Sequence, residues 1–554
     1  MHFVRKKSKM KYTVEKTDVL IIGTGLSGLM CARSLNKKKP GTKILMLGNG
    51  LGASPYVHGF NMPPLNPEDS TAAFEKDTFL GGREQSKPEL VKLLCEGPEK
   101  LLPILGELGI EFNRKGGQYS LIRPLGCSYP RVASVGNHTG VAIMNAIRAE
   151  FAAADNITEV QDTRALRLLC RDGRVMGALC YSVKENRFFY VAAEAVVLAC
   201  GGFCNIYPFS TNMGDIGGDG IAMAFGAGAR LIDMEFIQFE PSAAVAPPAL
   251  RGKSVITTMF YEGAVLRNKN GERFMLGYSK DGECVNKDVQ AKCIFKEIKE
   301  GRGTENGGVY FDCTGVGRER LNEQYDSYVK RYADVGIDIA TTPFEIAPAP
   351  HTSLGGAEVD TACRTSVEGL FACGEMVGGL HGANRLGGNA GLETMVFGRI
   401  AGEGVADFLG GADKNEADAD ETADFVDDTL SLLGETPVTD EFLADTRARM
   451  QKILLDKLNV LRCGDELADA IDELGDLMGE FDERSLADAP PDLAFRTVRL
   501  VNDLQTAYLL ALAAYERQGS NGCHVRTDSI EEKEKYRVVL QNTVDGVLVT
   551  KEKI

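Results

Sequence analysis

This 554-residue chain lacks the sequence motifs of metal centres, signal peptides and membrane-spanning helices. It has no tryptophan, and its 14 cysteines include no CxxC pair, since the two nearest, Cys200 and Cys204, are separated by three residues. This spacing excludes the usual iron–sulfur, zinc and c-type haem motifs. No apolar run reaches the ~18 residues of a membrane-spanning helix, and the basic N-terminus lacks the apolar core of a signal peptide. We therefore expect a reduced, cytoplasmic protein with no metal site and no membrane span.

Net charge and length limit the binding partners and the number of domains that we expect. A net charge of −16 disfavours nucleic acid and anionic membranes as main partners. The 44% apolar and 25% charged content is that of a soluble globular protein. Because a single hydrophobic core stops growing at about 250–300 residues, the length indicates two or three domains. The 62 glycines have no short period but gather at particular turns, and these turns carry the motifs.

A nucleotide-binding motif follows the first apolar strand. The run Asp18–Ile22 leads into Gly23-Thr-Gly25-Leu-Ser-Gly28, and an amphipathic helical pattern follows. In a GxGxxG motif between strand and helix, the first glycine allows the tight turn. The second lets the backbone approach a pyrophosphate, and the third allows close packing of the helix on the strand. This context predicts a dinucleotide site.

The second strand, residues 43–47, ends in Gly48-Asn49. Many dinucleotide folds have an acidic residue here that binds the ribose hydroxyls. This chain has none, so the group that binds the ribose is left open, with Asn49 as a candidate.

The densest group of motifs lies in residues 351–398. Two cationic or potentially cationic side chains, His351 and Arg385, stand among closely spaced glycines. An apolar strand between them ends in Gly374-Glu375. Glycine turns let a planar cofactor approach the backbone, and an arginine offers a bidentate fork for a carboxylate. The stretch therefore predicts a site where a cofactor and an acidic substrate meet.

A helical pattern begins just after Gly388-Asn389. The free N–H groups and the positive dipole end of a helix N-terminus attract anionic groups. This position would suit the anionic edge of a reduced flavin.

The stretches PHTSLGG, GLFACGE, HGANRLGGN and VFGR resemble the signature of the fumarate reductase and succinate dehydrogenase flavoproteins. L-aspartate oxidase and the soluble fumarate and urocanate reductases share it. The resemblance implies an α/β fold: a Rossmann-like FAD-binding domain with an inserted α+β capping domain and a C-terminal helical domain. The expected segments are 1–16 (flexible), 17–234 and 346–410 (FAD-binding), 235–345 (cap), 411–428 (acidic linker) and 429–554 (helical). Helical patterns at 441–461, 466–481 and 493–517 agree with the last segment.

The resemblance also implies FAD as the cofactor. Membrane-bound members carry a histidine, covalently linked to FAD, in the loop that corresponds to residues 52–61, and Gly52 stands near that place here. His58 stands elsewhere in the loop, so we expect non-covalent FAD. Asp219 would either contact FAD or cap the following helix. The expected cofactor residues are Gly23, Gly25, Leu26, Ser27, Gly28, Asn49, Ser54, Gly59, Ala199, Gly201, Asn212, Asp219, Gly374, Glu375, Arg385, Gly388 and Asn389.

The cap departs from the family pattern at two positions. The family has a substrate-binding histidine in QFHPT, and this chain has Glu240 there. The family arginine of RGEGG donates a proton, and counting back from residues 268–271 puts Phe260 in its place. A one-residue gap would put Tyr261 there instead. The expected catalytic residues are His351, Arg385, Glu240, Tyr261 and Glu262, with Arg251 and Arg267 as further candidates for the proton source.

The expected activity is hydride transfer between FAD and a small carboxylate, by reduction of a C=C bond or oxidation of a CH–CH bond. Losing a charge-assisted contact costs about 1.5–3 kcal/mol, and losing a positioned proton donor costs roughly 10²–10⁴ in rate. Fumarate itself should therefore be a poor substrate.

Two alternatives stay open. One is an amino-acid oxidase similar to L-aspartate oxidase, and the other is an electron-transferring flavoprotein subunit with no small substrate of its own. Since the chain has no motif for a metal centre, its electron partner should be separate: an iron–sulfur protein, a quinone or another carrier.

Overall fold

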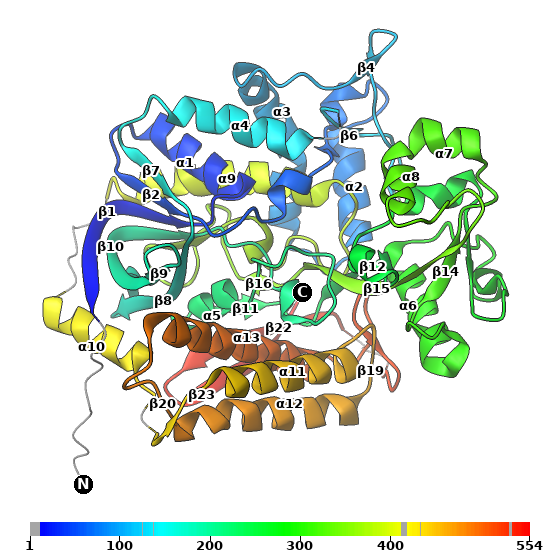
Figure 1. The fold of residues 1–554 in the computed structure, drawn as a ribbon. Helices are drawn as coiled ribbons and strands as arrows, with labels where there is room; N and C mark the ends of the chain where they lie inside the picture. Colours follow the sequence, from blue (N-terminus) through cyan, green and yellow to red (C-terminus); the bar gives the residue numbers. More distant parts are fainter. Residues whose placement is uncertain (1–10, 125, 137, 412–417, 433, 531–533) are drawn as a thin grey trace.

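The computed structural model describes residues 11–554 except 125, 137, 412–417, 433 and 531–533. Its largest sheet has seven strands and lies on the left in Figure 1. The strand order is β7–β2–β1–β10–β9–β8, with β17 also paired to β10. β1, β2, β7, β10 and β17 run parallel, whereas β8, β9 and β10 form the predicted antiparallel meander. The strands are β1 (Tyr12–Ile22), β2 (Ile44–Leu47), β7 (Ile157–Val160), β8 (Thr163–Arg171), β9 (Arg174–Ser182), β10 (Arg187–Leu198) and β17 (Leu370–Ala372).

β1 begins earlier than predicted. Residues 12–16 pair with residues 188–192 of β10, so this part of the expected flexible segment 1–16 is a strand. The long strand β10 supplies the backbone partners that make this extension favourable. Residues 1–10 lie outside the described part of the chain.

Helices lie above the sheet in the upper half of Figure 1. They are α1 (Leu26–Lys38), α2 (Thr71–Gly81), α3 (Pro88–Glu107), α4 (Thr139–Phe151) and α9 (Asn389–Phe408). Of these, α1 and α9 pack on the sheet and on each other. α9 packs tightly on α1 because glycine occupies the contact. A Cβ atom on Gly398 would lie 2.6 Å from Ser27 O, and one on Gly402 would lie 2.3 Å from Cys31 O. The two segments of the FAD-binding domain, far apart in sequence, are thus joined directly.

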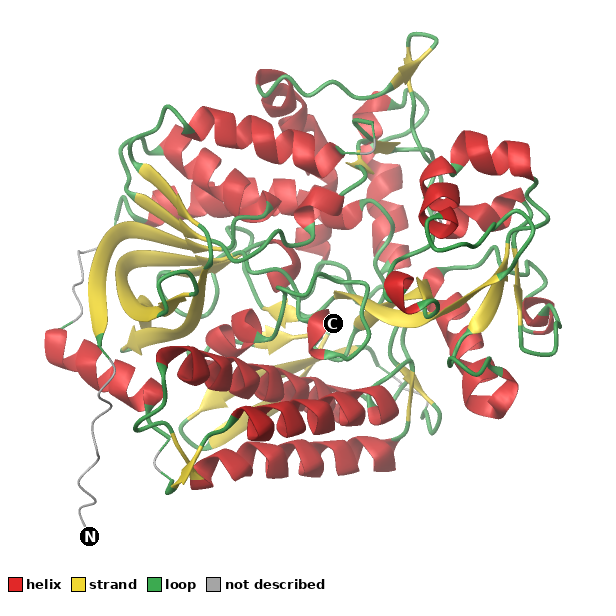
Figure 2. Ribbon diagram, in the orientation of Figure 1, coloured by secondary structure: helices red, strands yellow, loops and turns green. Residues whose placement is uncertain are grey.

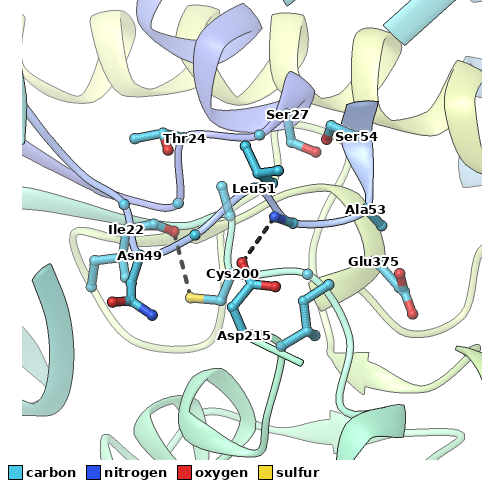
Figure 3. A pocket seen from close by; sticks show the side chains of 18 of the residues that line it. Ile22, Thr24, Ser27, Asn49, Leu51, Ala53, Ser54, Cys200, Asp215 and Glu375 are labelled. Atoms are coloured by element: carbon cyan, nitrogen blue, oxygen red, sulfur yellow. Dashed lines mark hydrogen bonds between the residues drawn. The ribbon is translucent and has the colours of Figure 1, made fainter. Parts of the chain in front are cut away.

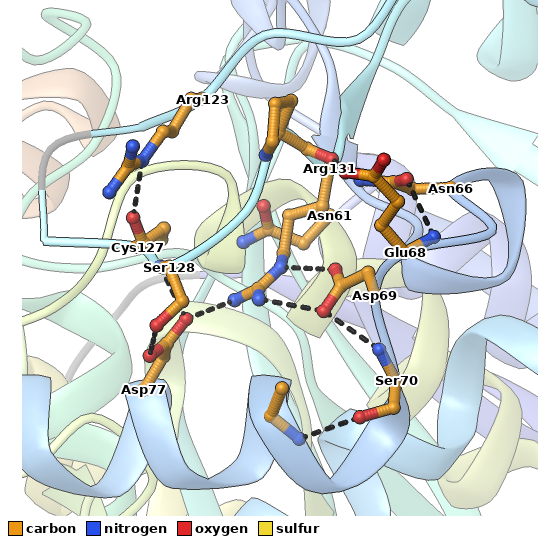
Figure 4. Close-up of polar contacts among 12 residues, drawn as sticks. Asn61, Asn66, Glu68, Asp69, Ser70, Asp77, Arg123, Cys127, Ser128 and Arg131 are labelled. Carbon is orange, nitrogen blue, oxygen red and sulfur yellow. Dashed lines mark hydrogen bonds and ion pairs between the residues drawn. The ribbon is translucent and has the colours of Figure 1, made fainter.

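Loops near α2 are fixed by a buried ion-pair cluster (Figure 4). Arg131, with a fully buried side chain, binds Asp69 through Nε and Nη2, at 2.8 and 3.0 Å. Its Nη1 donates to Asp77 of α2 at 2.8 Å, and Ser128 donates to the same carboxylate through N–H and O–H. These contacts tie the 128–131 segment to α2 and to the loop that precedes it.

The cap lies on the right in Figure 1 and has its own core. Its antiparallel sheet has the order β12–β15–β14–β13 and carries three helices. β15 runs through the expected domain boundary at residues 345 and 346, so the cap and the FAD-binding domain share this strand. The elements are β12 (Ile237–Ala244), β13 (Val265–Arg267), β14 (Val309–Asp312), β15 (Phe344–Ser353), α6 (Lys287–Glu297), α7 (Arg318–Gln324) and α8 (Asp326–Ala333).

The C-terminal region contains the three predicted helices, the red helices at the bottom of Figure 2. They are α11 (Asp440–Lys457), α12 (Gly464–Gly479) and α13 (Pro491–Glu516). The expected C-terminal helical domain also contains strands at its end. β22 (Tyr536–Thr543) and β23 (Gly546–Lys553) form a hairpin in a four-stranded sheet with β11 (Leu231–Ile232) and β16 (Gly356–Ala357). The apolar residues 538–540 of β22 are buried there, which explains the strand.

The expected acidic linker 411–428 is also partly wrong. Residues 419–428 lie in α10 (Ala419–Leu430), whereas residues 412–417 lie outside the described part. Asp418 caps this helix by accepting from Asp420 N–H, and Val426 and Leu430 are buried. An apolar stripe at helical spacing therefore outweighs the acidic composition.

Candidate active site

A pocket opens at the carboxyl ends of β1 and β10, where α1 begins (Figure 3). Gly23 has φ +120°, and a Cβ atom there would lie 2.1 Å from Ala199 O, so only glycine fits. Gly25 stands just before α1 and has no side chain that could cap the helix. The N–H group of Leu26, the first residue of α1, donates to Ser54 Oγ at 2.9 Å. A Cβ atom on Gly28 would lie 2.0 Å from Gly23 O, as close helix–strand packing predicts. The α1 N-terminus is therefore built for an anionic group.

Charged side chains gather at one end of this pocket. Arg164 donates to Asp219 at 2.9 Å, and Asn49 lies 3.0 Å from the same guanidinium. Asp215 accepts from Gly52 N–H at 2.9 Å, which closes one loop on another (Figure 3). These polar groups lie near the end of β2, where the sequence predicts the residue that binds the ribose.

Buried carboxylates line the other end. Glu375 accepts from Ser353 N–H at 3.0 Å, and burial raises the pKa of Glu375 to about 7. Glu393 Oε2 lies 2.9 Å from His381 Nε2. Its Oε1 is buried and has no hydrogen-bond partner among the described residues. Because a buried acceptor needs a donor, this atom calls for a ligand with hydroxyl or N–H groups.

A second group of polar residues lies where β12 and β15 of the cap meet the loop before α9. We call Glu240, Lys287, His351 and Arg385 the cap cluster. Lys287 Nζ donates to Glu240 Oε2 at 2.5 Å. His351 Nδ1 lies 2.8 Å from Thr211 Oγ1. Arg385 contacts Thr352 Oγ1 at 3.4 Å, and its buried Nε has no partner among the described residues.

Burial and neighbouring charges set the protonation states of the cap cluster. Burial raises the pKa of Glu240, but the ammonium group of Lys287 outweighs it, and the pKa stays below its ordinary value. Burial lowers the pKa of His351 to about 3, so its imidazole is neutral near pH 7. Burial also lowers the pKa of Arg385. With Lys287 and Arg385 positive and Glu240 negative, the cluster carries one net positive charge.

Comparisons with known proteins agree with this architecture. Residues 18–390 match the model of the FAD binding domain, and residues 447–544 match that of the fumarate reductase flavoprotein C-terminal region. The chain is 35% identical to an uncharacterized FAD-dependent oxidoreductase of Methanocaldococcus jannaschii, over 94% of this chain and 95% of the relative. It is 34% identical to one of the subunits of the CoM/CoB fumarate reductase of Methanothermobacter marburgensis, over 95% and 97%. The chain belongs to the fumarate reductase flavoprotein family.

The fold is shared with a solved member of this family. The flavoprotein of Escherichia coli quinol fumarate reductase superposes with a TM-score of 0.89 at 26% identity, over 98% of this chain and 97% of that one. FAD is the cofactor of this family, and the pocket at the α1 N-terminus is its candidate site. Its residues fit the cofactor, because a helix N-terminus suits the pyrophosphate and the unpaired Glu393 Oε1 suits a hydroxyl of the ribityl chain. None of the described helices is both long and apolar enough to cross a membrane.

Most of the expected cofactor residues lie in or directly beside this candidate FAD site. Those that line the pocket are Gly23, Gly25, Ser27, Asn49, Ser54, Ala199, Gly201, Asp219 and Glu375. Asp219 does not cap α5 (Asp219–Gly226) with its side chain, because its carboxylate binds Arg164 and Asn502. It therefore belongs to the wall of the pocket.

Arg385 belongs to the cap cluster, and the other expected cofactor residues outside the pocket have packing contacts in the structure. Asn389 Oδ1 accepts from Asn61 at 2.6 Å, which ties α9 to β3 (Phe60–Asn61). Asn212 donates weakly to His351 O at 3.5 Å. Gly59, Gly374 and Gly388 approach neighbouring atoms too closely for a side chain. Leu26 and Gly28 pack the N-terminal turns of α1.

Two expected catalytic residues do not join the cap cluster. The Tyr261 side chain is 58% exposed, and Glu262 forms an ion pair with Arg320 at 2.8 Å. They lie in a short 3-10 helix, residues 257–262, whose buried residue Phe260 stacks on Phe311. The hydrophobic contact of Phe260 orients this helix so that its next two side chains face outward. The structure therefore places Tyr261 and Glu262 outside the cap cluster.

The further candidates for the proton source are also engaged elsewhere. Arg267 pairs with Asp312 at 2.8 Å, and the Arg251 guanidinium lies 4.7 Å from the centre of the Phe209 ring. Lys287 was missed by the sequence reasoning. A signal existed, because lysine at the first position of α6 is disfavoured by the helix dipole and calls for an acidic partner. Only the tertiary contact identifies Glu240 as that partner.

Proposed function

We propose that this flavoprotein transfers hydride between FAD and a small carboxylate substrate, by reducing a C=C bond or oxidising a CH–CH bond. The observation that carries the proposal is Arg385, a half-buried guanidinium with an unpaired Nε at the junction of the FAD-binding domain and the cap, among the residues that the structure describes. Arginine binds carboxylates in a bidentate geometry, and few other ligands would satisfy this group. Bound FAD supplies or accepts the hydride.

Lys287 is the proposed proton donor in the reducing direction. Its ammonium group belongs to the cap cluster, 28% of its side chain is exposed, and it can regain a proton from solvent. Glu240 holds the ammonium in place, and neutral His351 beside it can accept a hydrogen bond from the substrate or from Lys287. A general acid must give up its proton, and of the two cations in the cap cluster Lys287 can do so, whereas an arginine stays protonated.

Two residues of the cap, Phe260 and Glu240, bear on whether fumarate is a substrate. Phe260 at the expected arginine position leaves no proton donor there, but Lys287 provides one from another element. Glu240 remains a buried carboxylate beside the substrate site, with 3% of its surface exposed. Because like charges repel strongly in a buried site, we retain the expectation that fumarate is a poor substrate.

Two other functions have specific support. An amino-acid oxidase is favoured by the pairing of cationic Arg385 with anionic Glu240, which would match a carboxylate and an ammonium group. An electron-transferring subunit is favoured by Phe260, which fills the cap with an aromatic stack where a polar residue is expected. In each case FAD is non-covalent, since Gly52 lines the pocket at the position expected for the linking histidine.

The electron partner is proposed to be a separate protein or a quinone. Fourteen free thiols, most of them buried, support a reducing, cytoplasmic location.

An anaerobic experiment tests the proposal. The protein is denatured to confirm that FAD is released, and native protein is then reduced chemically and mixed with unsaturated acids, quinones or oxygen. We expect an unsaturated acid to reoxidise the flavin, and the rate to fall at least about tenfold in Arg385→Met. Arg318→Met, on the cap surface, serves as the control. Reoxidation only by quinones or redox proteins would contradict the proposal and favour the electron-transferring subunit.

A further inference from the structure

Glu240 lies in an irregular part of β12. It pairs with Ala349 of β15, and the register then shifts before Ala243. Pro241, which cannot donate to a strand ladder, occupies the bulge. Bulges re-aim side chains and are frequent next to active sites. Here the bulge places the Glu240 carboxylate close enough to His351 for the two to interact electrostatically. Glu240 is only 3% exposed.

The two oxygens of Glu240 differ in their surroundings. Oε2 accepts from Lys287 at 2.5 Å. Oε1 lies 3.3 Å from Ser242 Oγ, but that hydroxyl lies closer, at 2.8 Å, to Val255 O. A hydroxyl has a single proton, and the shorter contact takes it. Oε1 therefore keeps its capacity to accept a hydrogen bond from a ligand.

The charge of the cap cluster limits the charge of the ligand. Lys287 is neutralised by Glu240, His351 is neutral, and within the cluster Arg385 is left to balance a bound anion. One carboxylate on Arg385 makes the site neutral. A second carboxylate would add an uncompensated negative charge beside Glu240, in a setting where water screens little.

We infer that the substrate carries one carboxylate, held by Arg385, and at its other end an uncharged or cationic hydrogen-bond donor that binds Glu240 Oε1. This inference rests on the proposed function and names its substrate class: monoamides, amino acids or other acids with an N–H or O–H group at the far end. Glu240 is the residue that selects this class against dicarboxylates.

Binding to the oxidised, FAD-loaded protein tests the inference independently of turnover. Succinamate and succinate have nearly the same shape, but succinamate has a carboxamide in place of one carboxylate. Each is titrated while the flavin absorption spectrum is followed. We expect succinamate to bind about 10- to 100-fold more tightly, as befits one charge-assisted hydrogen bond gained and one repulsion avoided.

Two variants sharpen the test. Glu240→Gln keeps the shape, frees the charge of Lys287 and should reverse the preference toward succinate. Glu319→Gln, at an exposed position on α7, is the matched control and should leave the preference unchanged. Tighter or equal binding of succinate by the wild-type protein, no binding of succinamate, or a preference unaffected by Glu240→Gln would overturn the inference.

Turnover separates this inference from the proposed function. Flavin reoxidation by the monoamide of fumarate, faster than by fumarate, would support both. Selective binding of succinamate without reoxidation by either acid would contradict the proposed function and leave the assignment of the binding site standing.

Discussion

Lys287 Nζ lies 2.5 Å from Glu240 Oε2, and this ion pair joins the first turn of α6 to β12. A helix N-terminus disfavours a cation, so the lysine depends on the carboxylate for its position. The carboxylate in turn depends on the lysine, because a buried unpaired charge is costly. The pair therefore fixes both the charge of the cap cluster and the location of its proposed acid.

Replacing Lys287 by methionine should slow flavin reoxidation by an active unsaturated acid about 10²- to 10⁴-fold, because the proton donor is lost. The FAD absorption spectrum should be retained. The double variant K287M/E240Q removes the unpaired carboxylate, and its rate should remain low. Lys292→Met, at an exposed position of the same helix, is the control. Stopped-flow rates of Lys287→Met within about threefold of wild type would exclude this residue as the donor.

Acid should destabilise the protein through His351. Burial lowers its pKa to about 3, whereas the unfolded chain has about 6.5. Below pH ~6.5 the unfolded state binds a proton here and the folded state does not. Stability is therefore lost as the pH falls from about 6.5 toward 3, with a slope of about 1.4 kcal/mol per pH unit from this residue.

His351→Gln should remove that slope. Urea unfolding with excess FAD, compared between about pH 4 and 6, measures the difference in slope between variant and wild type. His138→Gln, at an exposed position before α4, provides the control. Equal slopes in wild type and His351→Gln would show that burial does not keep this imidazole neutral.

Gly23→Ala should yield protein without FAD. The added Cβ atom would lie 2.1 Å from Ala199 O, and a φ of +120° is strained for any residue with a side chain. Both effects would displace the glycine turn before α1, where the sequence predicts the pyrophosphate. Flavin content per protein, read from the absorption spectrum, checks this. Gly106→Ala, at a helical site with open space, should keep its FAD. A fully loaded Gly23→Ala protein would refute the assignment of this turn.

Arg131→Met should lower the free energy of unfolding by roughly 3–5 kcal/mol, because Asp69 and Asp77 would each lose a buried partner. Chemical denaturation measures this loss. Arg318→Met breaks only an exposed ion pair with Asp338 and should change stability little. A loss of less than about 1 kcal/mol for Arg131→Met would mean that the cluster adds little to folding.

Short-range patterns predicted much of the fold. The strand before Gly23, the meander of β8 to β10 and the helices α11 to α13 follow from apolar periodicity and turn residues. The strands that were not predicted have one cause, because each depends on a partner strand distant in sequence. β1 extends to Tyr12 because β10 is long, and the hairpin of β22 and β23 exists because β11 offers an edge.

The sequence alone determined the class of this protein. Its glycine motifs specify the turn geometry of an FAD site, and local backbone geometry is encoded locally. Only the tertiary structure decided the contents of the cap cluster. Phe260 turns Tyr261 and Glu262 outward, and Lys287 reaches Glu240 from 47 residues away. Electrostatic partners of this kind are chosen by packing between elements, and sequence spacing cannot encode them.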